Sequence, residues 1–196
     1  METNVDKFLE FKKTCDLQSS DFIQQLMGYE SQTAISYWDY VRELLEDDEI
    51  DFEHREHKGA QDLFNSMLNY GYAILYAKVW QALLGAKLNP FDSFIHTRKD
   101  NKPTLVYDMV EIFRSQVVDR VAISLVQKGY DLDMKNQLLT DETRILLVKS
   151  IMERLARYEK YQGAETKMEV IIQKQASLLA SAISGESKFK PYIAKW

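Results

Sequence analysis

This 196-residue chain has one cysteine, Cys15, and few residues that interrupt helices, with seven glycines and three prolines. A single cysteine cannot form an internal disulfide, which excludes a disulfide-stapled scaffold and favours a reducing compartment such as the cytoplasm. The chain also lacks Asn-Gly and Asp-Gly pairs between alternating apolar runs, the strongest short signal of a β-hairpin. These absences predict an all-α protein.

Long hydrophobic runs are absent as well. The most apolar stretch, residues 73–86, is too short to cross a membrane and contains Lys78. The N-terminus alternates charged and apolar residues and has no hydrophobic core of a signal peptide. We therefore expect no membrane partner.

Basic residues are outnumbered by acidic ones, 25 to 30, which gives a net charge of -5. Because phosphate contacts depend on Lys and Arg, this total argues against a nucleic-acid-binding protein. The charge is uneven, however: residues 1–66 carry a net -10, whereas residues 67–139 carry +2 and residues 140–196 carry +3. The later part of the chain can therefore present a basic face.

Apolar residues recur at three- and four-residue spacing through most of the chain, which is typical of helices. The predicted helices run from about residue 5 into 17–45, then over 60–84, 103–129, 140–161 and 166–184, with an acidic loop at 46–56. A chain of this length can build one substantial core and is short for two. We expect a single multi-helix bundle domain over residues 1–196, in which residues 184–196 form a tail that leaves the bundle.

The most informative polar residues lie within residues 89–119. His96 follows a helix end and lies in an irregular connection, while Asp108 and Glu111 are three residues apart on the next predicted helix and should project side by side. Two acids beside an imidazole can bind a divalent metal. A single histidine can equally be a packing residue, and the two acids with Arg114 can form a solvated ion-pair face.

Four motifs follow one another along the chain: YES at 29–31, NSMLNYGYAIL at 65–75, LNPFDSFIH at 88–96 and LVYDMVEIFR at 105–114. Together they resemble the CRISPR spacer-acquisition integrase and endonuclease family, the Cas protein numbered one, and the match runs through essentially the whole chain. Two positions depart from the family pattern: Ser31 replaces a glycine or alanine, and Ser93 replaces a glycine.

The resemblance implies a chemistry. Glu30, His96 and Glu111 fall on the family's metal ligands for Mg²⁺ or Mn²⁺, and Asp108 falls on the aspartate that orients His96, holds a water or binds a second ion. The implied reaction joins the 3′-hydroxyl ends of a short duplex, the protospacer, to the CRISPR repeat by transesterification, with nuclease activity as a side outcome. No covalent protein intermediate is required.

Double-stranded DNA is the implied substrate, and we expect the basic residues around the site to bind it by neutralising phosphates. These residues, with two near-site side chains of the NSMLNYGYAIL motif, are Arg98, Lys99, Lys102, Arg114, Arg120, Asn69 and Tyr72.

Family members usually begin with a β-rich domain of ~100 residues through which two copies pair. Because Glu30 lies near the start of this chain, we expect the α-helical catalytic domain without that β-rich domain: a minimal integrase, the end of a fusion such as a reverse-transcriptase fusion, or an engineered fragment. The resemblance also implies a homo-oligomer and a small ferredoxin-like CRISPR adaptation partner. Two alternatives stay open, a catalytically weak DNA-binding or assembly subunit and a helical interaction module.

Overall fold

The computed structural model describes residues 3–16, 18–48, 50–57, 59–94 and 101–194. The all-α prediction is confirmed, because the described residues form seven α-helices and only two short β-hairpins. Within the described residues, no helix is both long enough and apolar enough to cross a membrane. The contacts divide the chain into two compact units, Met1–Glu56 and His57–Trp196.

The first unit is a helical hairpin of α1 (Asn4–Thr14) and α2 (Phe22–Leu44), followed by the short 3₁₀ helix η1 (Glu46–Asp48). Thr3 and Asp6 form a reciprocal capping box that begins α1. The two helices pack through aromatic rings, with the Phe11 centroid 4.7 Å from Tyr29 and 6.1 Å from Phe22.

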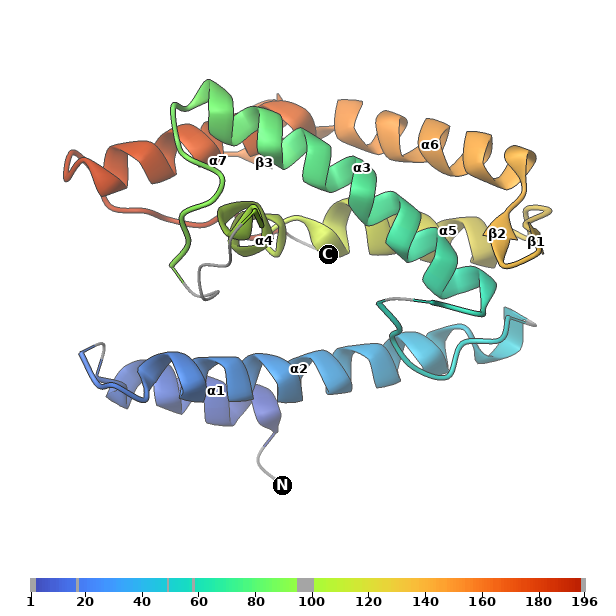
Figure 1. The fold of residues 1–196 in the computed structure, drawn as a ribbon, viewed down its shortest axis with the longest axis horizontal. Helices are drawn as coiled ribbons and strands as arrows, with labels where there is room; N and C mark the ends of the chain where they lie inside the picture. Colours follow the sequence, from blue (N-terminus) through green and yellow to red (C-terminus); the bar gives the residue numbers. More distant parts are fainter. Residues whose placement is uncertain (1–2, 17, 49, 58, 95–100, 195–196) are drawn as a thin grey trace. The chain divides into compact units, whose positions relative to one another are not determined.

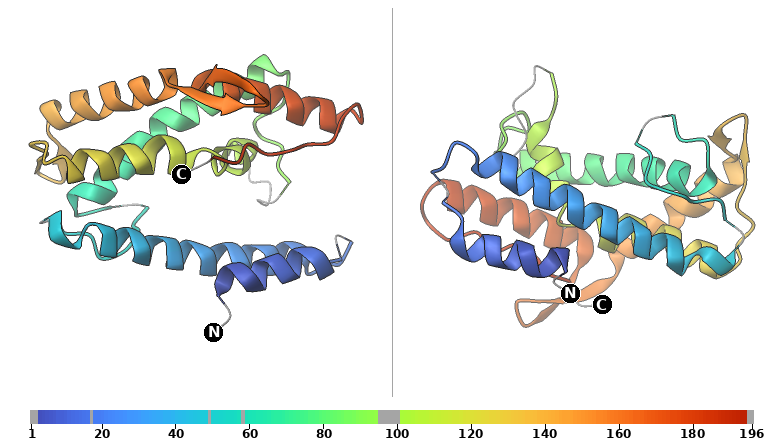
Figure 2. Two further views of the ribbon diagram at one scale, coloured as in Figure 1. Left: turned by 180° about the vertical axis from the view of Figure 1, so that it is seen from behind. Right: turned by 90° about the horizontal axis from the view of Figure 1, so that it is seen from below.

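The second unit is built around α3 (Leu63–Gly85), which packs against α7 (Met168–Ile183), α6 (Asp141–Ala156) and the segment that contains α4 and α5 (Figure 1). A helix with neighbours on several sides needs apolar residues around most of its circumference. Gly71 lies at the closest approach: an added Cβ would be 2.5 Å from Cγ1 of Val118. Figure 2 shows these helices from behind and from below.

The predicted helix over 103–129 is interrupted. The structure has α4 (Thr104–Val110), a turn at 111–113, the π-helical turn η2 (Ser115–Asp119) and α5 (Arg120–Gln127). No glycine or proline marks the interruption, so the prediction of one continuous helix was wrong for a tertiary reason. The π-helical turn buries Val117, Val118, Gln116 and Asp119 together, and such turns are frequent at functional sites.

Two hairpins replace segments that were expected to be helix or loop. Strands β1 (Met134–Lys135) and β2 (Leu138–Leu139) form one, and β3 (Tyr158–Tyr161) and β4 (Ala164–Lys167) form the other. The helix predicted to reach Tyr161 ends at Ala156. Both two-residue turns have positive φ at each position, at Asn136–Gln137 and at Gln162–Gly163, the geometry that suits tight hairpins.

The tail over residues 184–196 was predicted to leave the bundle; most of its described residues are exposed, but Tyr192 departs from that prediction. Tyr192 is buried, and its ring stacks on Phe113 with 6.2 Å between centroids. Its backbone N–H donates to Oε1 of Gln175 at 3.0 Å, and the Gln175 amide donates to the carbonyl of Lys190 at 3.2 Å. The Tyr192 ring and the buried amide of Gln175 therefore hold this part of the tail against the core.

Candidate functional site

Glu111 and Arg114 form an ion pair at the end of α4. The distance from Arg114 Nη1 to Glu111 Oε1 is 2.6 Å, and the Glu111 side chain is 41% exposed. Arg114 also donates from Nη2 to the hydroxyl of Tyr76 at 3.0 Å, and its guanidinium lies 4.5 Å from the centre of the Tyr72 ring. Arg114 is thus fixed by α3 on one side and holds the Glu111 carboxylate on the other.

The electrostatics of Arg114 follow from these neighbours. Burial, the largest single influence, acts to lower the pKa of Arg114. The charge of Glu111, together with Tyr76 and Tyr72, outweighs burial and raises the pKa above its ordinary value. Arg114 therefore stays protonated beside Glu111.

Tyr72 connects this pair to the buried π-helical turn. Its hydroxyl donates to Oδ1 of Asp119 at 2.5 Å, and both residues are almost completely buried. The hydrogen bond fixes the Tyr72 ring against which Arg114 lies. Asp119, Tyr72, Arg114 and Glu111 therefore form one continuous chain of contacts.

Asp108 makes a backbone contact that helical spacing alone does not predict, and its role in the site stays a prediction. Its Oδ2 accepts a hydrogen bond from the backbone N–H of Phe94 at 2.9 Å. The same segment is tied to the start of α4 by Leu105, whose N–H donates to the carbonyl of Pro90 at 3.0 Å. Asp108 therefore anchors the backbone two residues before His96.

Three of the predicted site residues, His96, Arg98 and Lys99, lie outside the described residues. Glu30 is an exposed residue of α2 in the first unit, and its joint role with Glu111 stays a prediction. In the part of the chain that the structure describes, no group of three or more His, Cys, Asp and Glu side chains could hold a metal ion.

The remaining predicted DNA-binding residues differ in exposure. Lys102 is exposed just before α4, Arg120 is exposed at the start of α5, and Asn69 is half-buried on α3. Tyr72 is buried beneath Arg114, which makes it a support for that residue and leaves no face open for stacking on a base.

Sequence reasoning missed two members of this cluster, Tyr76 and Asp119. Tyr76 lies on an apolar helix and has no local sequence signal of a polar role, whereas the structure shows that its hydroxyl accepts a hydrogen bond from Arg114. The signal for Asp119 was present in the sequence: a single acid within the apolar run VVDRV has to find a buried hydrogen-bond donor.

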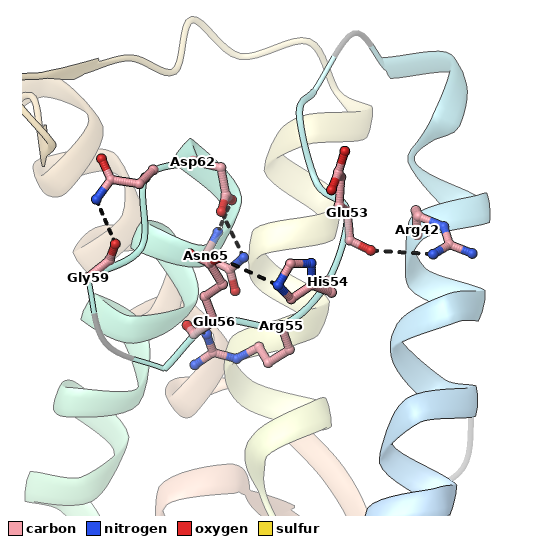
Figure 3. Close-up of polar contacts among 9 residues, drawn as sticks. Arg42, Glu53, His54, Arg55, Glu56, Gly59, Asp62 and Asn65 are labelled. Carbon is pink, nitrogen blue, oxygen red and sulfur yellow. Dashed lines mark hydrogen bonds and ion pairs between the residues drawn. The ribbon is translucent and has the colours of Figure 1, made fainter.

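The segment EHREH at residues 53–57 contains two histidines beside acidic residues. His54 is 71% exposed on its side chain and lies 3.5 Å from Glu56, and Arg42 donates to the carbonyl of Glu53 at 3.4 Å (Figure 3). In the second unit, Asp62 caps α3 by accepting from the backbone N–H of Asn65 at 2.7 Å. The contacts of His54 and Glu53 are those of a polar connecting segment, and the contact of Asp62 is that of a helix N-cap.

Comparison with known proteins gives a consistent result. The family model described as CRISPR associated protein Cas1 matches residues 3–174. The CRISPR-associated endonuclease Cas1 1 of Francisella tularensis subsp. novicida is 35% identical over 191 residues, which are 95% of this chain and 58% of the relative. The Cas1 1 endonuclease of Archaeoglobus fulgidus is 33% identical over 185 residues, covering 88% of this chain and 53% of the relative.

A solved structure described as a casposase bound to integration product is similar in fold. It has a TM-score of 0.82 and 26% sequence identity, and the match covers 97% of this chain and 58% of that one. The chain thus spans a little over half the length of these relatives. Since the family model covers most of its residues, the chain belongs to the Cas1 family of CRISPR-associated proteins.

Proposed function

We propose that this chain is the catalytic part of a divalent-metal-dependent DNA integrase and endonuclease of CRISPR adaptation. It would join the 3′-hydroxyl ends of a protospacer duplex to the border of the CRISPR repeat by transesterification. The observation that carries the proposal is the hydrogen bond from Phe94 to Asp108, which ties the segment before His96 to the helix that ends just before Glu111. Family membership and the integration product named for the casposase support the same chemistry.

Glu30, His96 and Glu111 would hold the ion. Carboxylate oxygens are hard ligands that suit Mg²⁺, and an imidazole ligand is compatible with Mn²⁺. The partly exposed carboxylate of Glu111 fits this role, because an ion and a phosphate can reach it from solvent. When bound, the ion would stabilise charge on the phosphate oxygens and assist attack by the 3′-hydroxyl.

The protein's own residues would supply positioning. Arg114 would fix the rotamer of Glu111 through the 2.6 Å ion pair, and Asp108 would set the place of His96 through the Phe94 backbone. Arg98, Lys99, Lys102 and Arg120 would neutralise DNA phosphates, a contact that carries little sequence information.

The test is strand transfer of a labelled short duplex into a supercoiled plasmid that carries a CRISPR repeat, with Mg²⁺ or Mn²⁺. Glu111→Ala should reduce joining by at least about 100-fold, because several kcal/mol of charge stabilisation are lost. Glu165→Ala, which removes an exposed acid on β4, is the matched control and should retain full activity. Circular dichroism would check that both variants are folded.

Wild-type joining by Glu111→Ala would contradict the proposal. DNA binding by the wild type without joining, whichever ion is added, would favour the alternative of a DNA-binding or assembly subunit that needs a further domain or partner.

Both ends of the protospacer must be joined, so we further propose that the chain works as a homo-oligomer in the prokaryotic cytoplasm, with the small ferredoxin-like adaptation protein as its partner. Light scattering should show more than one copy on a duplex that mimics the integration product. A monomer both free and bound to DNA would contradict this assembly.

A further inference from the structure

A polar pocket lies in the second unit, between α5 and α6. The cavity has a volume of about 300 Å³, and its lining includes four cations, Arg120, Lys128, Arg154 and Arg157, but a single acid, Glu153. A pocket with this charge attracts anions, and its arginines can bind planar, multidentate anions through their forked N–H groups.

Arg154 gives the pocket a preorganised donor. Its side chain is only 5% exposed, and it is held by two hydrogen bonds: Nε donates to the carbonyl of Gln116 at 2.7 Å, and Nη1 donates to Glu159 at 2.6 Å. The third nitrogen, Nη2, is buried and has no hydrogen-bond partner in the structure. A buried N–H group without an acceptor is unfavourable, and Arg154 is among the residues that line this cavity.

We infer that this pocket binds a phosphate group, and that the DNA backbone supplies it. Arg154 would provide the fixed N–H group, while Lys128 and Arg157, both exposed at the surface, would add charge around it. The ring of Tyr130, 48% exposed on the same pocket, can pack against a sugar or base. The DNA source rests on the function proposed above, whereas phosphate binding itself does not.

The pocket is connected to the cluster around Glu111. Gln116 belongs to the π-helical turn that begins one residue after Arg114. Its carbonyl accepts from Arg154, and its side-chain oxygen lies 3.5 Å from Nη1 of Arg120. A duplex that passes Glu111 and continues along α5 would therefore meet a second phosphate contact on the same rigid segment.

A purely structural role for Arg154 explains fewer of these contacts than phosphate binding does. The ion pair with Glu159 ties the β3–β4 hairpin to α6, which accounts for Nη1 but not for the unpartnered Nη2. It also does not account for the presence of Lys128 and Arg157 on the same cavity as Arg154.

The direct experiment titrates inorganic pyrophosphate into the full chain at low salt by calorimetry. The pocket variant is Lys128→Ala/Arg157→Ala, and the matched control is Lys160→Ala/Lys188→Ala, which removes two exposed lysines outside the pocket. We expect binding by wild type and control, and at least about tenfold weaker binding by the pocket variant, a loss of roughly 1.4 kcal/mol. Equal affinity for all three, or no binding by the wild type, would overturn the inference.

Fluorescence anisotropy with a labelled duplex then tests the source of the phosphate. The pocket variant should reduce the slope of log K against log salt by about 2, because two phosphate contacts are lost, and the control should not. An unchanged slope in a variant that no longer binds pyrophosphate would overturn the DNA assignment and leave a free phosphate compound as the ligand. A wild type that binds pyrophosphate but no DNA would refute the proposed function while supporting the pocket.

Discussion

Replacing Tyr72 by phenylalanine removes one oxygen atom and leaves the ring beneath Arg114 in place. The lost hydroxyl donates to Asp119 at 2.5 Å, and the two residues are 3% and 2% exposed. A buried hydrogen bond to a carboxyl group is worth roughly 1.5–3 kcal/mol, because water cannot replace the missing donor. We therefore expect Tyr72→Phe to lower the free energy of unfolding by about 2 kcal/mol.

Urea unfolding followed by circular dichroism measures this loss, and calorimetry should show a fall in Tm of about 4–8 °C for a chain of this size. Tyr70→Phe is the matched control, because Tyr70 lies on the same helix and is 39% exposed. That variant should stay within about 0.5 kcal/mol of the wild type.

A double-mutant cycle identifies the acceptor. In an Asp119→Ala background the hydroxyl of Tyr72 has lost this partner, so the further effect of Tyr72→Phe should fall below about 0.5 kcal/mol. A loss on Tyr72→Phe that is the same in both backgrounds would refute the reasoning. Since the ring is retained, strand transfer measured well below the Tm should change by less than about threefold, a shift under 1 kcal/mol.

Three further predictions concern the same unit. Asp108→Ala should lower the rate of strand transfer by about tenfold or more without loss of folding. Asp108→Asn keeps an oxygen that can accept from the Phe94 N–H, so its rate should lie between those of the wild type and Asp108→Ala. Equal activity of Asp108→Ala and wild type would exclude the anchoring role. Gly71→Ala should destabilise the protein by about 1–2 kcal/mol in urea unfolding, since the new Cβ would meet Val118 at 2.5 Å and the gain in helix propensity offsets only part of the clash; an unchanged midpoint would contradict this. Burial and the charge of Glu159 raise the pKa of Tyr192 above its ordinary value of 10.0, so the stability it contributes is complete below pH 10 and is lost as pH rises through the folded-state pKa. Unfolding at pH 8 and pH 10.5 should therefore show a smaller alkaline loss for Tyr192→Phe, and an identical loss would contradict the assignment.

The parts of the fold that the sequence predicted are those set by local periodicity. The central helix was expected over 60–84 and is observed at Leu63–Gly85, and the last helix was expected over 166–184 and is observed at Met168–Ile183. Each has a local start or stop, such as Asp62, whose side chain caps the first of them. Such signals lie within a few residues of the element that they define.

The parts that could not be predicted depend on residues distant in sequence. The hydrogen bond between Tyr72 and Asp119 joins positions 47 residues apart, and the π-helical turn that presents Asp119 has no local marker. The same limit affected the candidate site. Spacing alone predicts that Asp108 and Glu111 share a face, but it does not predict their partners, the backbone N–H of Phe94 and the guanidinium of Arg114.

The two departures from the family motifs can be judged from backbone geometry. Glycine is favoured where φ is positive, and neither Ser31 nor Ser93 is among the residues with positive φ. Ser31 lies inside α2, where a serine adopts ordinary helical geometry, and Ser93 precedes the residue whose N–H Asp108 holds. Neither serine strains the chain, so Asp108 can hold the backbone at Phe94 without a glycine before it.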